Sequence, residues 1–450
     1  MADNQRLKNW YLTLFRDFEN SLNGERSSPL HKLRKEAIEK FADLDFPDLH
    51  QEDWRFTDIS PILKYDFGHP SKEVLPTKGE VAGIGFHGLE GQRVVFVNGF
   101  YTPELSTLLT VPQGTIIGSL ADAMRPQGHG TARETPPSRF LSEKYLTCAK
   151  PAADGNIFTA LNSAFILDGA YVEIPENVAI EKPIHLIFIS TGIDKTISQP
   201  RNLFVAGKNS QARIIEHYVS MGNGVYFTNA VTEAFLGENS SVETIRIQSE
   251  NMNSYHIATT EVVAEADSNY ESQAISLGAS IYRHNLNVTL RGEGGNAALD
   301  GLYLTSGGQL SDTHSLIDHA SPHCTSQEHY KGILDDRSRG VFNGKIMVRR
   351  GAQRTNSYQE NRNIILSDEA KVDTKPQLEI FADDVKCSHG ATVGQLDKES
   401  MFYLRSRGIG EEKAKMILIY AFADDVLKNI KIEEVHSSLE SILSNRFLRG

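Results

Sequence analysis

The chain has 450 residues, of which 40% are hydrophobic and 23% charged, as is ordinary for a globular protein with a large core. Its formal net charge of −12 argues against a nucleic-acid or anionic-membrane binder, because phosphate groups are bound by basic surfaces. The three widely spaced cysteines predict no disulfide framework. The chain shows neither a secretory leader nor about 20 consecutive apolar residues, so a cytoplasmic location is expected.

Residues 1–150 are predicted to form an N-terminal domain of helices and mixed structure. Apolar side chains recur at helical spacing between residues 7 and 22 and again between 30 and 41, until Pro47 blocks further helix. Residues 93–98 alternate like a strand, and the Gly- and Pro-rich stretch 125–137 is typical of an exposed loop.

Between residues 151 and 396, short β-branched segments alternate with polar turns. Four turn clusters, beginning at Gly207, Gly237, Glu265 and Gly292, follow one another at intervals of 30, 28 and 27 residues. A loose period of this length without helices predicts a β-solenoid, in which stacked coils bury inner faces that one coil cannot bury alone. A large β-sandwich is the alternative, since it would also show a strand roughly every 8 to 12 residues.

Residues 397–450 are predicted to form a C-terminal helical domain. Asp397 can cap a short helix that Gly408 can end with a positive φ. The next helix, from Glu411, is apolar nearly all round, so it must be buried in a bundle or against a partner. A last amphipathic helix begins near Ile432.

The stretch 381–394 is the most informative chemically, because it holds Cys387 and His389 two residues apart. In an extended segment these side chains point to the same face. A soft thiolate and an imidazole would then converge, which suits iron–sulfur chemistry or a soft metal. The pair is only a fragment of a ligand set, and a Cys buried as a small hydrophobic residue is the alternative.

Other chemical motifs are incomplete. No Gly-x-x-x-x-Gly-Lys-Ser/Thr loop occurs, so the chain is expected to bind no nucleotide itself. One stretch is rich in histidine but lacks the spacing of a zinc helix, and it is predicted to be a long solvated loop. Its members are His314, His319, His323, Cys324 and His329. A β-helical carbohydrate enzyme would need paired carboxylates in a groove, whereas adjacent acids in a strand point to opposite faces.

Several segments spread over the chain carry a family resemblance. They are Glu-Asp-Trp-Arg-Phe-Thr at 52–57, stretches within 162–186, His-Tyr-Lys-Gly at 329–332, 340–346, 353–359, Lys-Cys-Ser-His-Gly-Ala-Thr-Val-Gly at 386–394 and 401–409. Together they resemble the SufB/SufD family of the SUF iron–sulfur cluster assembly system. The chain looks closer to the SufD branch, because Gly390 stands where SufB has Glu and residues 366–376 lack the further Cys of SufB.

The resemblance implies a right-handed parallel β-helix over 151–396, flanked by N-terminal and C-terminal helical domains. It implies a scaffold subunit, not an enzyme, that pairs with SufB through the β-helix and binds the SufC ATPase through C-terminal helices at about 405–430. A transient iron–sulfur cluster would form at the SufB interface with Cys387 and His389 as candidate ligands for iron and cluster. Sulfur-delivery proteins would act through the complex.

The resemblance also implies a role in iron acquisition, while the net charge and the short apolar runs predict that this chain binds no nucleic acid or membrane. Two alternatives stay open. The chain could be a purely structural subunit that positions SufB and SufC without ligating metal, and it could form a homodimer when SufB is absent.

Overall fold

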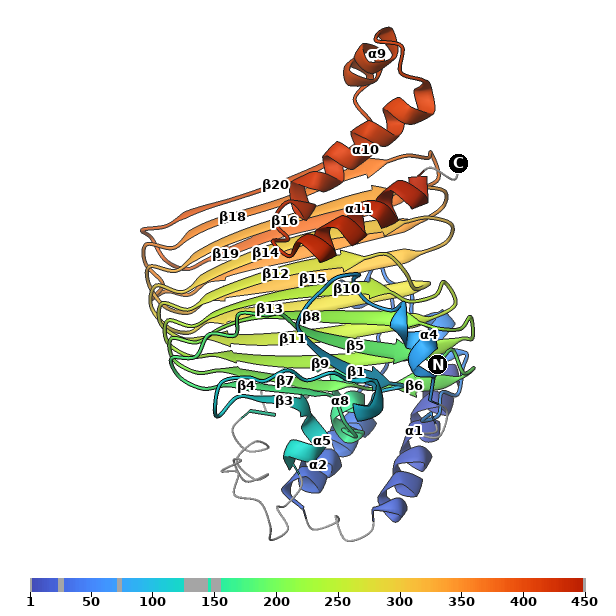
Figure 1. The fold of residues 1–450 in the computed structure, drawn as a ribbon, viewed down its shortest axis with the longest axis vertical. Coiled ribbons are helices and arrows are strands. Elements are labelled where there is room, and N and C mark those ends of the chain that lie inside the picture. The colour runs from blue at the N-terminus through green and yellow to red at the C-terminus, as the bar shows by residue number, and fades with distance from the viewer. Residues whose placement is uncertain (1, 23–27, 71–74, 125–144, 147–154, 448–450) are drawn as a thin grey trace.

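The computed structural model describes residues 2–22, 28–70, 75–124, 145–146 and 155–447. At its centre two sheets of mainly parallel strands stack into a β-solenoid (Figure 1). From β8 onward the chain alternates between the two sheets, so each strand lies beside the strand two places earlier in the chain. The predicted β-solenoid is confirmed, and the β-sandwich alternative is wrong.

The first sheet contains, in spatial order, β2 (Phe100–Tyr101), β1 (Gln92–Val97), β5 (Ile184–Ser190), β8 (Gln211–Ser220), β10 (Ser241–Ser249), β12 (Asn269–Ser276), β14 (Asn296–Thr305), β16 (Thr325–Leu334), β18 (Asn356–Ile365) and β20 (Lys386–Gly394). The second contains β19 (Lys371–Ile380), β17 (Arg339–Val348), β15 (Leu310–His319), β13 (Ile281–Leu290), β11 (Tyr255–Ala264), β9 (Tyr226–Leu236), β7 (Arg201–Ala206), β4 (Ala170–Ile174) and β3 (Ile116–Ser119), with β6 (Thr196–Ser198) beside β9. Strands β1 and β3 join these sheets from upstream of residue 151.

The recurring turn clusters are corners of the coil, and they explain the repeat seen in the sequence. Asn177, Asn209, Asn239 and Asp267 adopt a positive φ, which Asn and Asp tolerate better than most residues. The side-chain Nδ2 of Asn239 donates to Oδ1 of Asn209 at 2.8 Å, and Asn209 donates likewise to Asn177 at 2.7 Å. One corner therefore supports the next, which fixes the register of the stack.

Alternate side chains along each strand point inward and form the core. Apolar residues such as Leu186, Ile214 and Leu286 fill most of it. Polar groups also enter: the buried Arg246 guanidinium lies 3.0 Å from Oε2 of Glu216. Because such groups are bonded to one another, the interior accommodates them at a tolerable desolvation cost.

Helices cover the N-terminal end of the solenoid (Figure 1). The elements of this part are α1 (Ala2–Ser21), α2 (Pro29–Asp43), η2 (Glu52–Trp54), α3 (Ser60–Leu63), α4 (Lys78–Ala82), η3 (Pro103–Leu105), α5 (Leu120–Met124) and α8 (Ile157–Ala164). Apolar residues of α1, α2, α3 and α8 pack on Phe227 and Tyr255 of the second sheet, among others. Helix α4 packs instead on β1 and β5, and α5 packs on β4 and β7. The two predicted helices and the strand at 93–98 are confirmed, whereas the predicted loop at 125–137 lies outside the described residues.

Three helices follow the solenoid: α9 (Lys398–Ser406), α10 (Glu411–Leu427) and α11 (Glu433–Phe447). Asp397 caps α9 by accepting from the backbone N–H of Ser400 at 2.7 Å, and Gly408 has a φ of 82°, as predicted. Apolar residues of α10 and α11 cover the outer face of the first sheet, while α9 lies beyond β20 (Figure 1). Among the described residues, no helix is both long and apolar enough to cross a membrane.

Candidate functional site

The last two strands, β19 and β20, form what we call the end coil. Within the described part of the chain, β20 pairs only with β18 and β19 only with β17, so each has one free edge. Most residues of β20 are exposed, in contrast to the buried inner faces of earlier strands. A long free edge strand is a ready surface for pairing with another chain.

Cys387 and His389 lie on β20, so the segment is extended and both side chains share one face. Their partners on β18 are Ser357 and Gln359, which are buried and point inward. In a parallel sheet, residues in register point the same way. Both side chains therefore face the interior of the solenoid at its uncovered end.

The Cys387 side chain is half-buried and packs against an apolar cluster that consists of Ile346, Val348, Ala352 and Ala382. This burial raises the pKa of the thiol, and a backbone hydrogen bond from Ser357 acts in the opposite direction. Because the thiolate is the metal ligand, the thiol must lose its proton when a metal binds. His389, by contrast, is exposed.

One chain offers only part of a ligand set at this position. Among the described residues, the single group of three or more ligand-type side chains close enough to share an ion is Asp424, His436 and Glu440, on α10 and α11. That group contains neither Cys387 nor His389. Iron–sulfur clusters are held by about four protein ligands, so further ligands to a cluster here must come from outside this coil.

The predicted solvated loop of histidines is wrong. His314 and His319 lie on β15 and His329 lies on β16, with only His323 and Cys324 in the turn between them. Asp318 and Ser326 are strand residues with polar partners: Arg349 donates to Asp318 at 2.9 Å, and Nε2 of the buried His319 lies 2.9 Å from Oγ of Ser326. The histidines are thus distributed over both faces of the coil.

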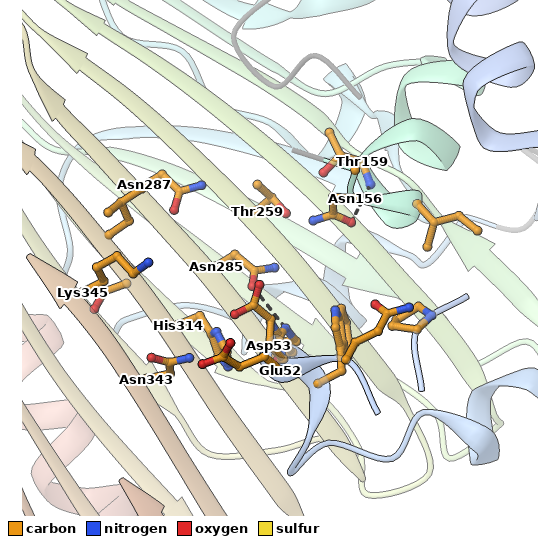
Figure 2. Close-up of a pocket in the computed structure, with 18 of the residues that line it drawn as sticks. Glu52, Asp53, Asn156, Thr159, Thr259, Asn285, Asn287, His314, Asn343 and Lys345 are labelled. Carbon is orange, nitrogen blue, oxygen red and sulfur yellow. Dashed lines mark hydrogen bonds between the residues drawn. The ribbon is translucent and has the colours of Figure 1, made fainter. Parts of the chain in front are cut away.

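A polar groove of about 550 Å³ lies on the outer face of the second sheet, beneath residues 45–54. Figure 2 shows Asn285, His314 and Asn343 in one row across neighbouring strands, with Glu52 and Asp53 beside them. Charged groups here pair with one another: Lys345 lies 2.9 Å from Glu379. The groove is separate from the end-coil pair, because neither Cys387 nor His389 lines it.

The segment above this groove is the sequence motif at 52–57, and it is fastened to the sheet. Arg283 stacks 3.8 Å above the Trp54 ring and donates to Oδ2 of Asp312 at 2.6 Å, and Thr57 donates to the same carboxylate at 2.5 Å. Burial would raise the pKa of Asp312, but Arg283 and His314 lower it to about 2. These contacts give the motif at 52–57 a structural role, which is to hold this segment against the second sheet.

Sequence reasoning missed Glu328 and Gln359, two fully buried polar residues that precede His389 in the stack. Glu328 is in register with Gln359 on the neighbouring strand, and Gln359 is in register with His389 on the next. The alternating polar residues of 326–330 and 357–361 were the available signal, but it could be used only once the coils were aligned.

Comparisons with known proteins place the chain in a broader context. The family model "SUF system FeS cluster assembly, SufBD core domain" matches residues 188–422, and the "SufBD protein N-terminal region" matches residues 5–186. An iron–sulfur cluster assembly SufBD family protein of Synechocystis sp. is 37% identical over 438 residues, covering 94% of this chain and 93% of the relative. Two further relatives are named iron–sulfur cluster assembly protein SufD.

The one from Escherichia coli is 29% identical over 411 residues and covers 90% of each chain. The one from Bacillus subtilis is 26% identical over 450 residues, covering 97% of this chain and 98% of the relative. The similarity thus includes the helical start, the solenoid, the end coil and most of α10.

Proposed function

Since the chain belongs to the SufBD family and so has a role in SUF iron–sulfur cluster assembly, we propose that it is a scaffold subunit that pairs with SufB and binds the SufC ATPase. It contributes Cys387 and His389 to a nascent cluster and takes part in iron acquisition. It performs no catalysis alone.

The observation that carries this proposal is the position of Cys387 and His389 on a strand with a free edge, facing the open end of the coil. A SufB coil added there would extend both sheets through backbone hydrogen bonds and bury the end of the core. It would also bring the missing ligands to a site that is incomplete in one chain.

The chemistry of the pair suits a cluster that is assembled and then released. Iron binding displaces the proton of the Cys387 thiol, whose raised pKa keeps it protonated until a metal or base arrives. Sulfur reaches the site from sulfur-delivery proteins bound to the complex. An imidazole in place of one thiolate leaves the cluster less strongly held, which favours transfer to a recipient.

The proposed SufC attachment is the C-terminal helical stretch at about 405–430, and we extend it to the whole of α9. Helix α9 extends past the end coil and exposes two adjacent aromatic side chains, Phe402 and Tyr403, at 75% and 56%. Aromatic residues are frequent anchors of protein interfaces. ATP binding by SufC would move these helices and shift the population of the SufB interface toward an open state.

The ligand role is tested with His389→Ala in the reconstituted complex. We expect the complex to assemble with normal stoichiometry but to mature much less cluster, because one ligand is missing. Gln395, which lies just past the same strand, supplies the control variant Gln395→Ala. Wild-type maturation by His389→Ala would remove the proposed role of this imidazole.

The attachment role is tested with Phe402→Ser combined with Tyr403→Ser. A truncation before α9 would also remove α10 and α11 and so uncover the apolar face of the sheet that they protect. Substitutions of exposed side chains change the proposed attachment without uncovering that face. Loss of SufC capture with an unchanged melting temperature supports the assignment, and full capture contradicts it.

A purely structural subunit is the second candidate, and the apolar packing of Cys387 favours it. A thiol buried among aliphatic side chains can serve as a small hydrophobic residue. Iron and sulfide bound by the reconstituted complex, compared between the wild type and a Cys387→Ala/His389→Ala variant, separates the two functions. Equal metal content in both would support the structural candidate.

A further inference from the structure

Three side chains occupy the same inward position in three successive strands of the first sheet: Glu328 on β16, Gln359 on β18 and His389 on β20. We call them the inward row. Neighbouring strands lie about 4.8 Å apart, so Glu328 lies roughly 10 Å from His389 across two strands. The row thus leads from the core to the end coil.

The two inner members are unusual as core residues. Both are fully buried, and Nε2 of Gln359 donates to Oε2 of Glu328 at 2.6 Å. The amide oxygen of Gln359 has no hydrogen-bond partner, whereas the Ser315 hydroxyl is a second donor beside the Glu328 carboxyl group. Burial raises the pKa of Glu328 to about 7, and within the described chain no cation forms an ion pair with it. Buried polar groups without partners destabilise a fold, so their presence calls for a functional reason.

Their arrangement leaves one acceptor available next to His389. Because the Gln359 nitrogen is committed to Glu328, the amide is fixed in one orientation and its oxygen remains free. Gly344 on β17 makes room for this side chain, since a Cβ there would lie 2.3 Å from Nε2 of Gln359. The next side chain in the row, on the side away from Glu328, is the imidazole of His389.

An imidazole that binds a metal through one nitrogen usually donates its other ring N–H to a protein acceptor, which fixes the tautomer and the ring orientation. We propose that Gln359, oriented by Glu328, accepts this hydrogen bond from His389 and so presents the other ring nitrogen at the open end of the coil. Gln359 and Glu328 are then positioning residues. The inference rests on the proposed function only for what the presented nitrogen binds.

The test uses the full-length chain with ¹⁵N-labelled histidine, in which two-bond ¹H–¹⁵N correlations report the tautomer of the neutral His389 ring. We expect one dominant tautomer in the wild type. Gln359→Leu should change the tautomer ratio by about fivefold, the factor that corresponds to a net hydrogen bond. Gln359→Glu, which keeps an acceptor, should retain the wild-type ratio, and Glu328→Leu should disturb it because the amide is no longer oriented.

Tyr330→Phe is the matched control, since it removes another buried, unpartnered polar atom of β16 outside the row. Melting temperatures establish that each variant still folds. Identical tautomer ratios in the wild type and Gln359→Leu overturn the inference. If instead the ratio changes but His389→Ala matures clusters normally, the proposed function fails while the orientation of the ring stands.

Discussion

Lys331 fastens α10 to the solenoid, and replacing it should loosen that helix measurably. Its side chain, on β16, is 1% exposed. The ammonium donates to the carbonyl of Phe422 at 2.9 Å, pairs with Asp425 at 2.5 Å and lies 4.3 Å from the Phe422 ring centroid. Lys331→Met removes the cation and keeps an unbranched apolar side chain that is one atom shorter.

The size of the effect follows from the interactions that the ammonium makes. A hydrogen bond from a charged donor contributes about 1.5–3 kcal/mol and the cation–π contact about 0.5–1 kcal/mol. The pair with Asp425 adds little because that carboxylate is 47% exposed. Desolvation of the ammonium in the wild type offsets part of this sum. A net loss of about 2 kcal/mol corresponds to a roughly 30-fold larger opening constant for α10.

Native-state hydrogen exchange of the α10 amides measures that constant. Lys428→Met is the control, because Lys428 pairs with the same Asp425 carboxylate at 3.0 Å but is 58% exposed. We expect at most about a twofold change for it, as for other exposed i,i+3 pairs. Equal exchange in the two variants, or unchanged exchange in Lys331→Met, would refute the reasoning.

Three further outcomes follow from the structure. Burial raises the pKa of Glu328 to about 7, so the neutral carboxyl contributes stability below pH 4.5, and this contribution is lost as the pH rises through 7. Urea unfolding between pH 5 and 8 should therefore show the free energy of unfolding of the wild type falling by up to about 3 kcal/mol relative to that of Glu328→Gln. Asn239→Ala should lower the free energy of unfolding by about 1–2 kcal/mol, because it loses the hydrogen bond to Asn209 and places alanine at a φ of 55°. Asn239→Gly should lower it by less, because glycine accepts this φ, and equal losses in the two variants would contradict this account of the corner. Gly301→Ala should lower the melting temperature, because the new Cβ would lie 2.0 Å from the Tyr330 ring, whereas Gly394→Ala, in open space, should leave it unchanged.

The repeat could be predicted because its cause is local. The corners need residues that accept a positive φ, so Asn209, Asn239 and Asp267 recur at the coil period. The C-terminal helix boundaries were equally local, since Asp397 caps α9 and Gly408 follows it. The pairing of Cys387 with His389 on one face followed from strand geometry alone.

What could not be predicted depends on distant parts of the chain. Strand β1 pairs with β5, some 90 residues later, and no local signal reveals that partnership. The prediction for the histidine-rich stretch was wrong because Ser and Asp are common in loops, while here His319 and Ser326 bond to each other inside a coil. Glu328 gains its meaning only from Gln359 and His389, which adjoin it through register.

Helices cover one end of the solenoid and leave the other uncovered, so unfolding should start at one end and proceed toward the other. Helices cover the first coils, whereas β19 and β20 each pair with a strand on one side only among the residues that the structure describes. In a linear array each unit is held by its neighbours, so fraying should begin at the bare terminus and travel inward. A companion that docks there would act as a thermodynamic cap, and the order of the Cys387 and His389 side chains would then depend on its concentration.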